Sequence, residues 1–241
     1  MLSHMRTKSP KIYTLGPLHL HLRTRLFDSN RTLFDQSSNS FHEVDRSCLS
    51  WLDKQPKGSV VYVSFGSIAV LSSEQAFEFW LGLVNSGKRF LWVLRPGVMP
   101  DEGKNITVEL IEGSKERGCI VSWAPEEEVL GHGAIGGFLT HSGWNSTLES
   151  VVEGVPMLCW PYFVDQQINS RFVSTVWGLG LDMKDLCDTH IVEKMAPTIT
   201  STQAESAQKA STTPTVQQRN AYVESFNREI MVIRNKMYVR N

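Results

Sequence analysis

The 241-residue sequence contains little cysteine and almost no net charge, and both shortages restrict its class. The four cysteines are far apart and form no CxxC pair, which favours reduced thiols over a zinc or disulfide framework. They are Cys48, Cys119, Cys159 and Cys187. The formal net charge of −1 gives no electrostatic reason to expect nucleic acid or an anionic membrane as a partner.

Long apolar runs are missing as well. No stretch approaches the length of a membrane-spanning helix, and no apolar segment of a secretory signal follows the basic start of the chain. Apolar residues nevertheless make up 41% of the sequence, which is enough for a hydrophobic core. The composition therefore predicts a soluble, cytoplasmic α/β protein with one large domain or two small ones.

Strands and helices alternate along the middle of the chain. Continuous apolar runs predict strands that are buried on both faces of a sheet. These strands are expected at 59–67, 90–94, 119–122, 135–140 and 157–160. Helices are expected at 45–55, 72–86, 126–130, 145–152 and 165–177. The alternation predicts an α/β fold with a doubly wound, Rossmann-like parallel sheet, whose ligands bind outside the carboxyl ends of the strands.

Three regions follow from these patterns. Residues 1–45 are expected to be a connector, because they are polar and have few periodic segments. Residues 46–195 are expected to form the domain. Residues 196–241 are expected to be a disordered tail, because their first part has almost no large apolar residue. Apolar residues recurring between Tyr222 and Met237 allow one amphipathic helix there.

Several helices carry further local predictions. Phe77, Trp80, Leu81 and Val84 share one side of the second helix, which favours core packing. Asn145 or Ser146 is expected to cap helix 145–152, and Asp165 to cap the helix that follows it.

The turn between strand 135–140 and the next helix has the composition of an anion site. The sequence has neither GxxxxGK followed by Ser or Thr nor GxGxxG, so a phosphate site needs another basis. Gly143 permits close backbone approach, and the first helical turn presents free N–H groups. His141, Asn145 and Ser146 add side-chain donors, and a charged His141 would favour phosphate further. The alternative is a core histidine beside a capping asparagine.

Other polar and aromatic residues lie at neighbouring strand ends. Trp123 offers a flat face for stacking a base, or is a tryptophan filling a surface groove. The carboxylate of Glu149 leans toward its helix N-terminus and suits two ribose hydroxyls; otherwise it is a favourable charge at that helix end. Asp165 and Gln166 suit sugar hydroxyls, although Asp165 alone also suits an N-cap. Together these residues predict a site for a nucleoside diphosphate sugar.

The stretch from Trp123 to Gln166 resembles the signature box of plant secondary-product UDP-glycosyltransferases, a family with the two-domain GT-B fold. The match covers all 44 positions of the box and extends into SVVYVSFGS and GKRFLWVLRPG upstream. It also extends downstream into INSRFVSTVWGLGLDM. The resemblance implies that the chain is the C-terminal, donor-binding half of such an enzyme.

The resemblance also implies a role for each part of the site. Trp123 would stack on uracil, and the backbone of Ala124 would bond the edge of the base. The residues implied to hold the diphosphate are Gly66, Ser67, His141, Asn145 and Ser146. Glu149 would bind the ribose hydroxyls. The residues implied to hold the sugar are Trp144, Asp165 and Gln166, and Gln166 resembles the members that prefer glucose.

Three departures from the family pattern stand out. Glu126 replaces a glutamine beside the nucleoside, which removes an amide donor and adds charge, and is expected to weaken donor binding. The family's N-terminal domain, which carries the general-base histidine and most of the acceptor pocket, is missing from the pattern. Residues 1–45 resemble only a remnant of that domain, its last strand, and the interdomain linker. His4, His19, His21 and His42 do not match the family's catalytic motif, so no catalytic base is assigned. The tail after Met195 also departs from the family.

The family reaction is an inverting transfer from a UDP-sugar to a small acceptor hydroxyl, with no metal and no cofactor. The resemblance therefore predicts a UDP-glycosyltransferase that uses UDP-glucose as co-substrate, with a small plant-type secondary metabolite as acceptor. No nucleic-acid or membrane partner is expected. The alternatives are a non-catalytic UDP-sugar-binding or partner-binding module and an inactive truncated product.

Overall fold

The computed structural model describes Thr7, residues 43–95, Ser114, residues 117–184 and residues 187–209. All of these except Thr7 belong to one compact unit, Ser37–Ser211. The connector before residue 43, most of the polar stretch 97–117 and the helix expected within 222–237 lie outside the described residues. The four N-terminal histidines, up to His42, lie outside them too.

The described core is a six-stranded sheet in which every pair of neighbours is parallel. The strands are β1 (Val60–Ser64), β2 (Arg89–Val93), β3 (Gly118–Val121), β4 (Ile135–Thr140), β5 (Met157–Cys159) and β6 (Gly180–Asp182). Their order across the sheet is β3-β2-β1-β4-β5-β6. The predicted doubly wound α/β fold is confirmed, and β6 is a strand that the sequence pattern did not predict.

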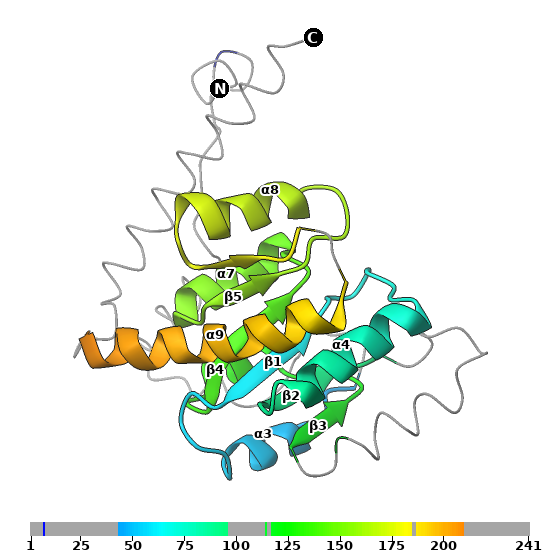
Figure 1. The fold of residues 1–241 in the computed structure, drawn as a ribbon, viewed down its shortest axis with the longest axis vertical. Coiled ribbons are helices and arrows are strands. Elements are labelled where there is room, and N and C mark those ends of the chain that lie inside the picture. The colour runs from blue at the N-terminus through cyan, green and yellow to red at the C-terminus, as the bar shows by residue number, and fades with distance from the viewer. Residues whose placement is uncertain (1–6, 8–42, 96–113, 115–116, 185–186, 210–241) are drawn as a thin grey trace. The chain divides into compact units, whose positions relative to one another are not determined.

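Helices cover both faces of this sheet. They are α3 (Ser47–Leu52), α4 (Ser73–Asn85), α6 (Glu126–Leu130), α7 (Trp144–Glu153), α8 (Gln166–Arg171), the π-helix η2 (Phe172–Val176) and α9 (Thr189–Lys209). Residues of α4 and α9 pack together on one face, and Figure 1 shows these two helices on the same side of the sheet. Residues of α3, α6 and η2 pack on the other face.

The central strand β1 shows why this sequence becomes a buried sheet. All five of its residues are buried. Val61 and Val63 join the α4 and α9 side, whereas Val60 and Tyr62 join the opposite core. Because successive side chains point to opposite faces, a strand covered on both sides needs apolar residues throughout.

The strand order reverses between β1 and β4, and this reversal positions the candidate site. Ser64 at the end of β1 pairs with Thr140 at the end of β4, so the two following loops start side by side. The chain then continues from β1 to β2 on one side and from β4 to β5 on the other. Such a switch point leaves a crevice outside the carboxyl ends of the strands, where open α/β sheets bind ligands.

Helix α4 begins as predicted, but its buried face differs from the predicted one. Ser72 and Gln75 form a reciprocal capping box at its start. The helix buries Ala76, Phe79 and Leu83, whereas Phe77 is 36% exposed. The predicted aromatic stripe is therefore only partly in the core. The face that α4 buries is the one that meets α9. This helix packs so closely on Gly82 that a Cβ there would lie 2.6 Å from Val192 Cβ.

Helix α9 also shows that the expected boundary after residue 195 is too early. Ala196 and Ile199 are fully or almost fully buried, at 0% and 2% exposure. Ile199 packs against the β4 backbone, since a Cβ on Gly137 would lie 2.8 Å from Ile199 Cγ2. The missing side chain of this strand glycine lets Ile199 approach the backbone closely, so a few apolar residues suffice to dock a helix of mostly polar sequence.

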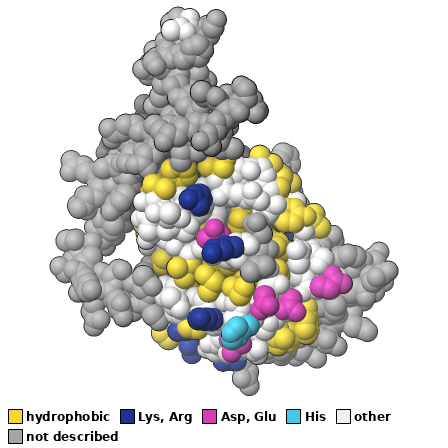
Figure 2. Space-filling model, turned by 45° about the horizontal axis from the view of Figure 1, so that its top comes forward, with side chains coloured by type: hydrophobic (Ala, Val, Ile, Leu, Met, Phe, Trp, Pro, Cys, Tyr) yellow, Lys and Arg dark blue, Asp and Glu magenta, His cyan; other side chains and the backbone are white. Residues whose placement is uncertain are grey.

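The surface of the described part agrees with the small net charge. Figure 2 shows charged side chains of both signs on one face, separated by apolar and neutral surface. None of the helices within the described ranges has the length and apolar character needed to cross a membrane.

The docking of α9 predicts the effect of truncating Ile199. Ile199→Ala should lower the free energy of unfolding by about 2–5 kcal/mol, the usual cost of removing a buried isoleucine side chain. Exposed Lys194→Ala on the same helix is the control and should change it by less than about 0.5 kcal/mol. Urea unfolding of both variants measures this difference. Equal stability of the two variants would show that residues beyond 195 do not belong to the core.

Candidate functional site

The predicted site residues all lie at or beyond the carboxyl ends of four strands of the sheet, β1, β3, β4 and β5. Gly66 and Ser67 follow β1, and Trp123, Ala124 and Glu126 follow β3. The residues that follow β4 are His141, Trp144, Asn145, Ser146 and Glu149. Asp165 and Gln166 follow β5. Parallel strands place these segments at one edge of the sheet, around the switch point.

His141 lies between two glycines at the centre of this edge. A Cβ built on Gly66 would be 2.6 Å from His141 Nε2, and one on Gly143 would be 2.3 Å from the same atom. Gly66 also has φ +72, a conformation that side chains disfavour. Both glycines are therefore required by the imidazole itself. The backbone after β1 and the backbone before α7 approach each other with only this ring between them.

The electrostatics of His141 differ from the charged form considered from the sequence. Burial lowers the pKa of His141 to about 4; nearby Arg95 lowers it further, while Asp165 and the Ser64 backbone oppose the shift. The ring is therefore neutral at neutral pH. Its Nδ1 is buried and makes no hydrogen bond of standard geometry within the described residues. A neutral imidazole can still donate one hydrogen bond to a ligand.

Helix α7 begins at the histidine loop without a side-chain cap. Its N-cap is Gly143, two residues before the earliest predicted cap, and this residue makes no side-chain cap hydrogen bond. Asn145 and Ser146 therefore lie inside that turn; Asn145 is exposed and Ser146 is 8% exposed. Uncapped N–H groups and the positive end of the helix dipole suit an anion.

Two strained residues lie in the loops after β4 and β5. Ser142 has φ +61 and Val164 has φ +59, and positive φ is unusual for residues with a side chain. Asn169, which is 2% exposed, donates from Nδ2 to the Ser142 carbonyl oxygen at 3.0 Å and to Asp165 Oδ2 at 2.9 Å. One buried amide thus connects the histidine loop to the predicted sugar-binding carboxylate. Asn169 was not predicted from the sequence, although its position four residues after Asp165 was visible.

Arg95 is a second residue that the sequence reasoning missed. It follows β2 and donates to the carbonyl oxygens of Ser67 and Ala69, the latter at 2.7 Å. These bonds hold the loop that carries Gly66. They also place a cation close enough to His141 to influence its pKa.

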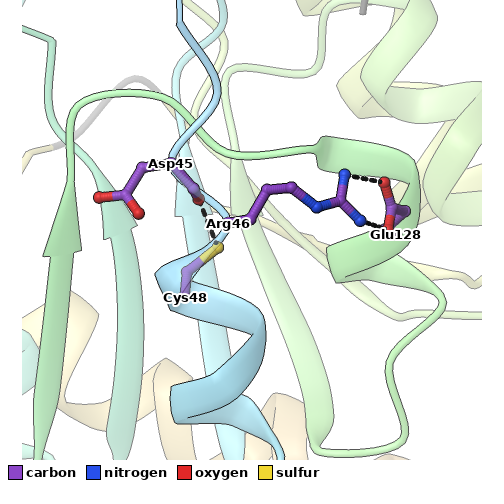
Figure 3. A network of polar contacts seen from close by, with 4 residues as sticks. All are labelled: Asp45, Arg46, Cys48 and Glu128. Atoms are coloured by element: carbon purple, nitrogen blue, oxygen red, sulfur yellow. Dashed lines mark hydrogen bonds and ion pairs between the residues drawn. The ribbon is translucent and has the colours of Figure 1, made fainter. Parts of the chain in front are cut away.

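The loop that carries Trp123 is held by the segment before α3. The Asp45 N–H donates to the Trp123 carbonyl oxygen at 2.9 Å. Arg46 makes two hydrogen bonds to the Glu128 carboxylate, at 2.9 and 2.6 Å, which join this segment to α6 (Figure 3). Asp45 was the predicted cap of α3; the N-cap is Arg46, and Asp45 Oδ1 accepts from the Ser47 N–H at 2.9 Å. The contacts orient the base of the loop without involving the Trp123 side chain.

Gln166 has a divided role. Its Oε1 accepts hydrogen bonds from the Tyr162 N–H at 2.8 Å and from the Phe163 N–H at 2.9 Å. The amide oxygen is therefore occupied by the loop after β5, and Nε2 is the part of the side chain left to donate to a ligand. Asp165, predicted to cap α8, makes no side-chain cap bond, so its carboxylate is not used by the helix backbone.

Glu126 and Glu149 bring two carboxyl groups together. Tyr62 and Ser64 place hydroxyl oxygens 3.5 and 3.4 Å from Glu126 Oε2, while Glu126 Oε1 is buried and accepts no hydrogen bond of standard geometry from the part of the chain that the structure describes. Burial, together with the neighbouring Glu126 charge, raises the pKa of Glu149 to about 9. Burial also raises the pKa of Glu126. Within the described ranges, no group of three or more His, Cys, Asp or Glu side chains could hold a metal ion.

A doubly wound sheet with a glycine-flanked histidine at its switch point defines an α/β ligand-binding domain. Comparison with known proteins makes the class specific. The family model for UDP-glucoronosyl and UDP-glucosyl transferases matches residues 32–211, well over half of the chain. The chain belongs to this family of UDP-glycosyltransferases, and the resemblance seen in the sequence is confirmed.

Curated relatives come from several plants. The chain is 61% identical over 198 residues to a 7-deoxyloganetic acid glucosyltransferase of Catharanthus roseus, covering 81% of the chain and 41% of that protein. It is 48% identical over 179 residues to an (R)-mandelonitrile beta-glucosyltransferase of Prunus dulcis, covering 74% of the chain and 37% of that protein. The chain thus spans about two fifths of the length of these relatives.

Solved structures support the same fold. Os79 of O. sativa in complex with UDP matches with a TM-score of 0.61 and 32% identity, covering 79% of this chain and 44% of that one. UGT2 of Phytolacca americana, complexed with UDP-2fluoro-glucose and pterostilbene, matches with a TM-score of 0.57 and 36% identity. That match covers 76% of this chain and 44% of the other. These glycosyltransferases have the GT-B architecture expected from the sequence.

The lowered pKa of His141 predicts a loss of stability in acid. The folded protein holds His141 neutral down to about pH 4, whereas the unfolded chain protonates it below the ordinary histidine pKa of 6.5. Since the unfolded state then binds more protons, the free energy of unfolding falls as pH drops from about 6.5 to 4, by up to about 3 kcal/mol.

Urea unfolding at pH 7 and pH 4.5 measures this contribution, with His141→Gln as the reference that cannot titrate. The wild-type protein should lose more stability than the variant over this interval. Parallel losses in both proteins would show that His141 is not buried in its neutral form.

Proposed function

We propose that this chain binds UDP-glucose at the β1–β4 switch point and is the donor-binding part of a UDP-glucosyltransferase. The observation that carries the proposal is the contact of His141 with Gly66 and Gly143, beside the uncapped start of α7. The close backbone, a neutral imidazole and a helix N-terminus without a side-chain cap form a surface complementary to a diphosphate. The names of the relatives, which are glucosyltransferases or complexes with UDP, support the same assignment.

The remaining residues divide the donor between them. Trp123 would stack on uracil, with the Ala124 backbone at the edge of the base. The residues proposed to hold the diphosphate are Gly66, Ser67, His141, Asn145 and Ser146. Glu149, with Glu126 beside it, would bind the ribose. The residues proposed for glucose are Trp144, Asp165 and the free Nε2 of Gln166.

The chemistry proposed for this domain is stabilisation of the leaving group. As the acceptor oxygen attacks the anomeric carbon, negative charge grows on the departing diphosphate. The N–H groups of the first turn of α7 and the His141 ring are oriented before the reaction, so they stabilise that charge without reorganising. The donor side of the reaction thus needs no metal ion.

A general base is not assigned to any described residue. His132 does contact a carboxylate, since its Nε2 lies 3.2 Å from Asp53 Oδ1. However, His132 precedes β4, at the amino ends of the strands, on the edge opposite the candidate site. The His132–Asp53 pair therefore has the composition of a catalytic dyad but lies too far from the candidate site to act as its base. Transfer by this domain needs a base supplied from elsewhere, a contribution typically worth ~10²–10⁴-fold.

The acceptor is proposed to approach from the loops after β1 and β5. These loops expose apolar side chains on the edge that carries the site: Ile68 is 72% exposed, Val70 54% and Val164 76%. Exposed apolar groups beside a polar site suit an apolar acceptor or a covering domain. The proposed acceptor is a small hydroxylated secondary metabolite, in line with the names of the relatives given above. The proposed location of the reaction is the cytoplasm.

A non-catalytic UDP-sugar-binding module is the second candidate, and the missing base among the described residues favours it. The two candidates differ in turnover. UDP-glucose that binds without transfer to any of a panel of phenols and alcohols would favour the binding module. Transfer to any acceptor would favour the enzyme.

Calorimetric titration of the full chain with UDP tests the proposed site. Gly143→Ala should weaken binding at least about tenfold, because the added Cβ displaces the His141 ring and the start of α7. Gly133→Ala is the matched control: a Cβ there meets nothing within 4 Å, and binding should be retained. Failure of the wild-type chain to bind UDP would refute the proposal, and so would equal binding by both variants.

A second titration tests the sugar contact. Gln166→Glu keeps an oxygen for the Tyr162 and Phe163 N–H groups but loses the Nε2 donor. It should weaken UDP-glucose binding about fivefold more than UDP binding, the loss expected for one hydrogen bond. A proportional loss for both ligands would show that Gln166 supports the loop and does not contact glucose.

A further inference from the structure

Helices α6 and α7 place two carboxyl groups within hydrogen-bonding range of each other, those of Glu126 and Glu149. Glu126 Oε1 is buried and receives no hydrogen bond from a described residue. Besides the Ser146 hydroxyl, its neighbour is the Glu149 carboxyl group, which as an anion has no proton to donate. A single proton held between the two groups would satisfy this oxygen.

Among the described residues, no cationic side chain is seen to interact with this pair. Tyr62 and Ser64 of β1 contribute neutral hydroxyl groups, and α7 adds the Ser146 hydroxyl. Glu127 of α6 adds negative charge. The remaining titratable groups of the adjoining segment are Asp45, Arg46 and Cys48.

Of these groups only Arg46 is cationic, and its guanidinium is committed to Glu128 at an exposed position, at 2.9 and 2.6 Å (Figure 3). Two neighbouring carboxyl groups in a desolvated site do not both ionise at neutral pH.

We propose that Glu126 and Glu149 share one proton, and that this singly protonated pair receives the ribose diol of the UDP donor. The second clause rests on the proposed function, whereas the shared proton does not. Glu126 thereby acts as a specificity-determining residue, because it allows the site to donate one hydrogen bond as well as to accept others.

A shared proton changes the expected effect of having a glutamate at position 126, where the family usually has a glutamine. The sequence suggested a carboxylate without a donor, next to the nucleoside. With the proton retained, the pair offers a donor in place of the amide and carries one negative charge. The pKa of Glu149, about 9, keeps that proton in place at neutral pH. Loss of the proton would leave two charges that repel the diphosphate and no donor for the diol.

Donor affinity should therefore fall in alkaline solution. Between pH 7 and 9.5 the wild-type chain should lose about fourfold in UDP affinity beyond any change seen in Glu126→Gln, which has no second ionisable carboxyl group. The uracil imide also ionises in alkali, so the variant measured in the same buffers is the reference. Glu128→Gln, on the same helix but outside the pair, is the control and should retain the wild-type slope. Calorimetric titration at each pH measures all three.

A measurement without ligand tests the shared proton by itself. The folded pair keeps a proton that the unfolded chain releases above a pH of about 4.5, so stability falls as pH rises toward 9. From pH 6 to 9 the Tm of the wild-type chain should drop at least about 4 °C more than that of Glu126→Gln. Glu149→Gln removes the same proton and replaces Glu126→Gln if that variant does not fold.

Each outcome decides one claim. Equal Tm profiles in wild type and variant overturn the shared proton. A Tm difference together with equal pH slopes in UDP affinity overturns the role of the pair in binding ribose and leaves the UDP site standing. A chain that binds no UDP at any pH refutes the proposed function and the ribose role together, while the Tm comparison still decides the shared proton.

Discussion

The packing of one imidazole ring against two glycine backbones determines the geometry of this site. His141 leaves no room for a Cβ on Gly66 or Gly143, so the loops after β1 and β4 must both be glycine at the point of contact. The ring is neutral because it is buried there. The start of α7, the strained Ser142 and the amide of Asn169 all depend on the position of this loop. A doubly wound sheet provides the crevice, and the histidine determines how closely its two sides approach.

Much of the fold could be predicted from the sequence, because its signals are local. Apolar runs identified β2, β3, β4 and β5 within about a residue, since a strand covered on both faces has little choice of side chains. The run at 59–67 identified β1 but extends three residues past its end at Ser64. The α4 capping box and the left-handed Gly154 after α7 are also local signals. The placement of the site residues at the strand ends followed from the same pattern, because parallel strands have all their carboxyl ends at one edge. The roles of those residues remain predictions.

The parts that could not be predicted depend on contacts between distant segments. Helix α9 packs on Gly82 and Gly137 through Val192 and Ile199, and the polar composition around Ile199 concealed this docking in the sequence. Because α4 packs against α9, its buried face consists of Ala76, Phe79, Gly82 and Leu83 and not of the predicted aromatic stripe. Likewise, the charge state of His141 and the pairing of Glu126 with Glu149 depend on burial, which a sequence does not state. Asn169 matters because it meets Ser142, 27 residues earlier in the chain.

The account depends on a diphosphate lying at the β1–β4 switch point, and a crystal structure of the chain with UDP tests this most directly. The account predicts the diphosphate beside Gly66, His141 and Gly143, with its oxygens accepting hydrogen bonds from the first turn of α7. It also predicts uracil against Trp123 and the ribose hydroxyls at the Glu126–Glu149 pair. UDP bound at the amino ends of the strands, or a diphosphate without contact to α7, would contradict it.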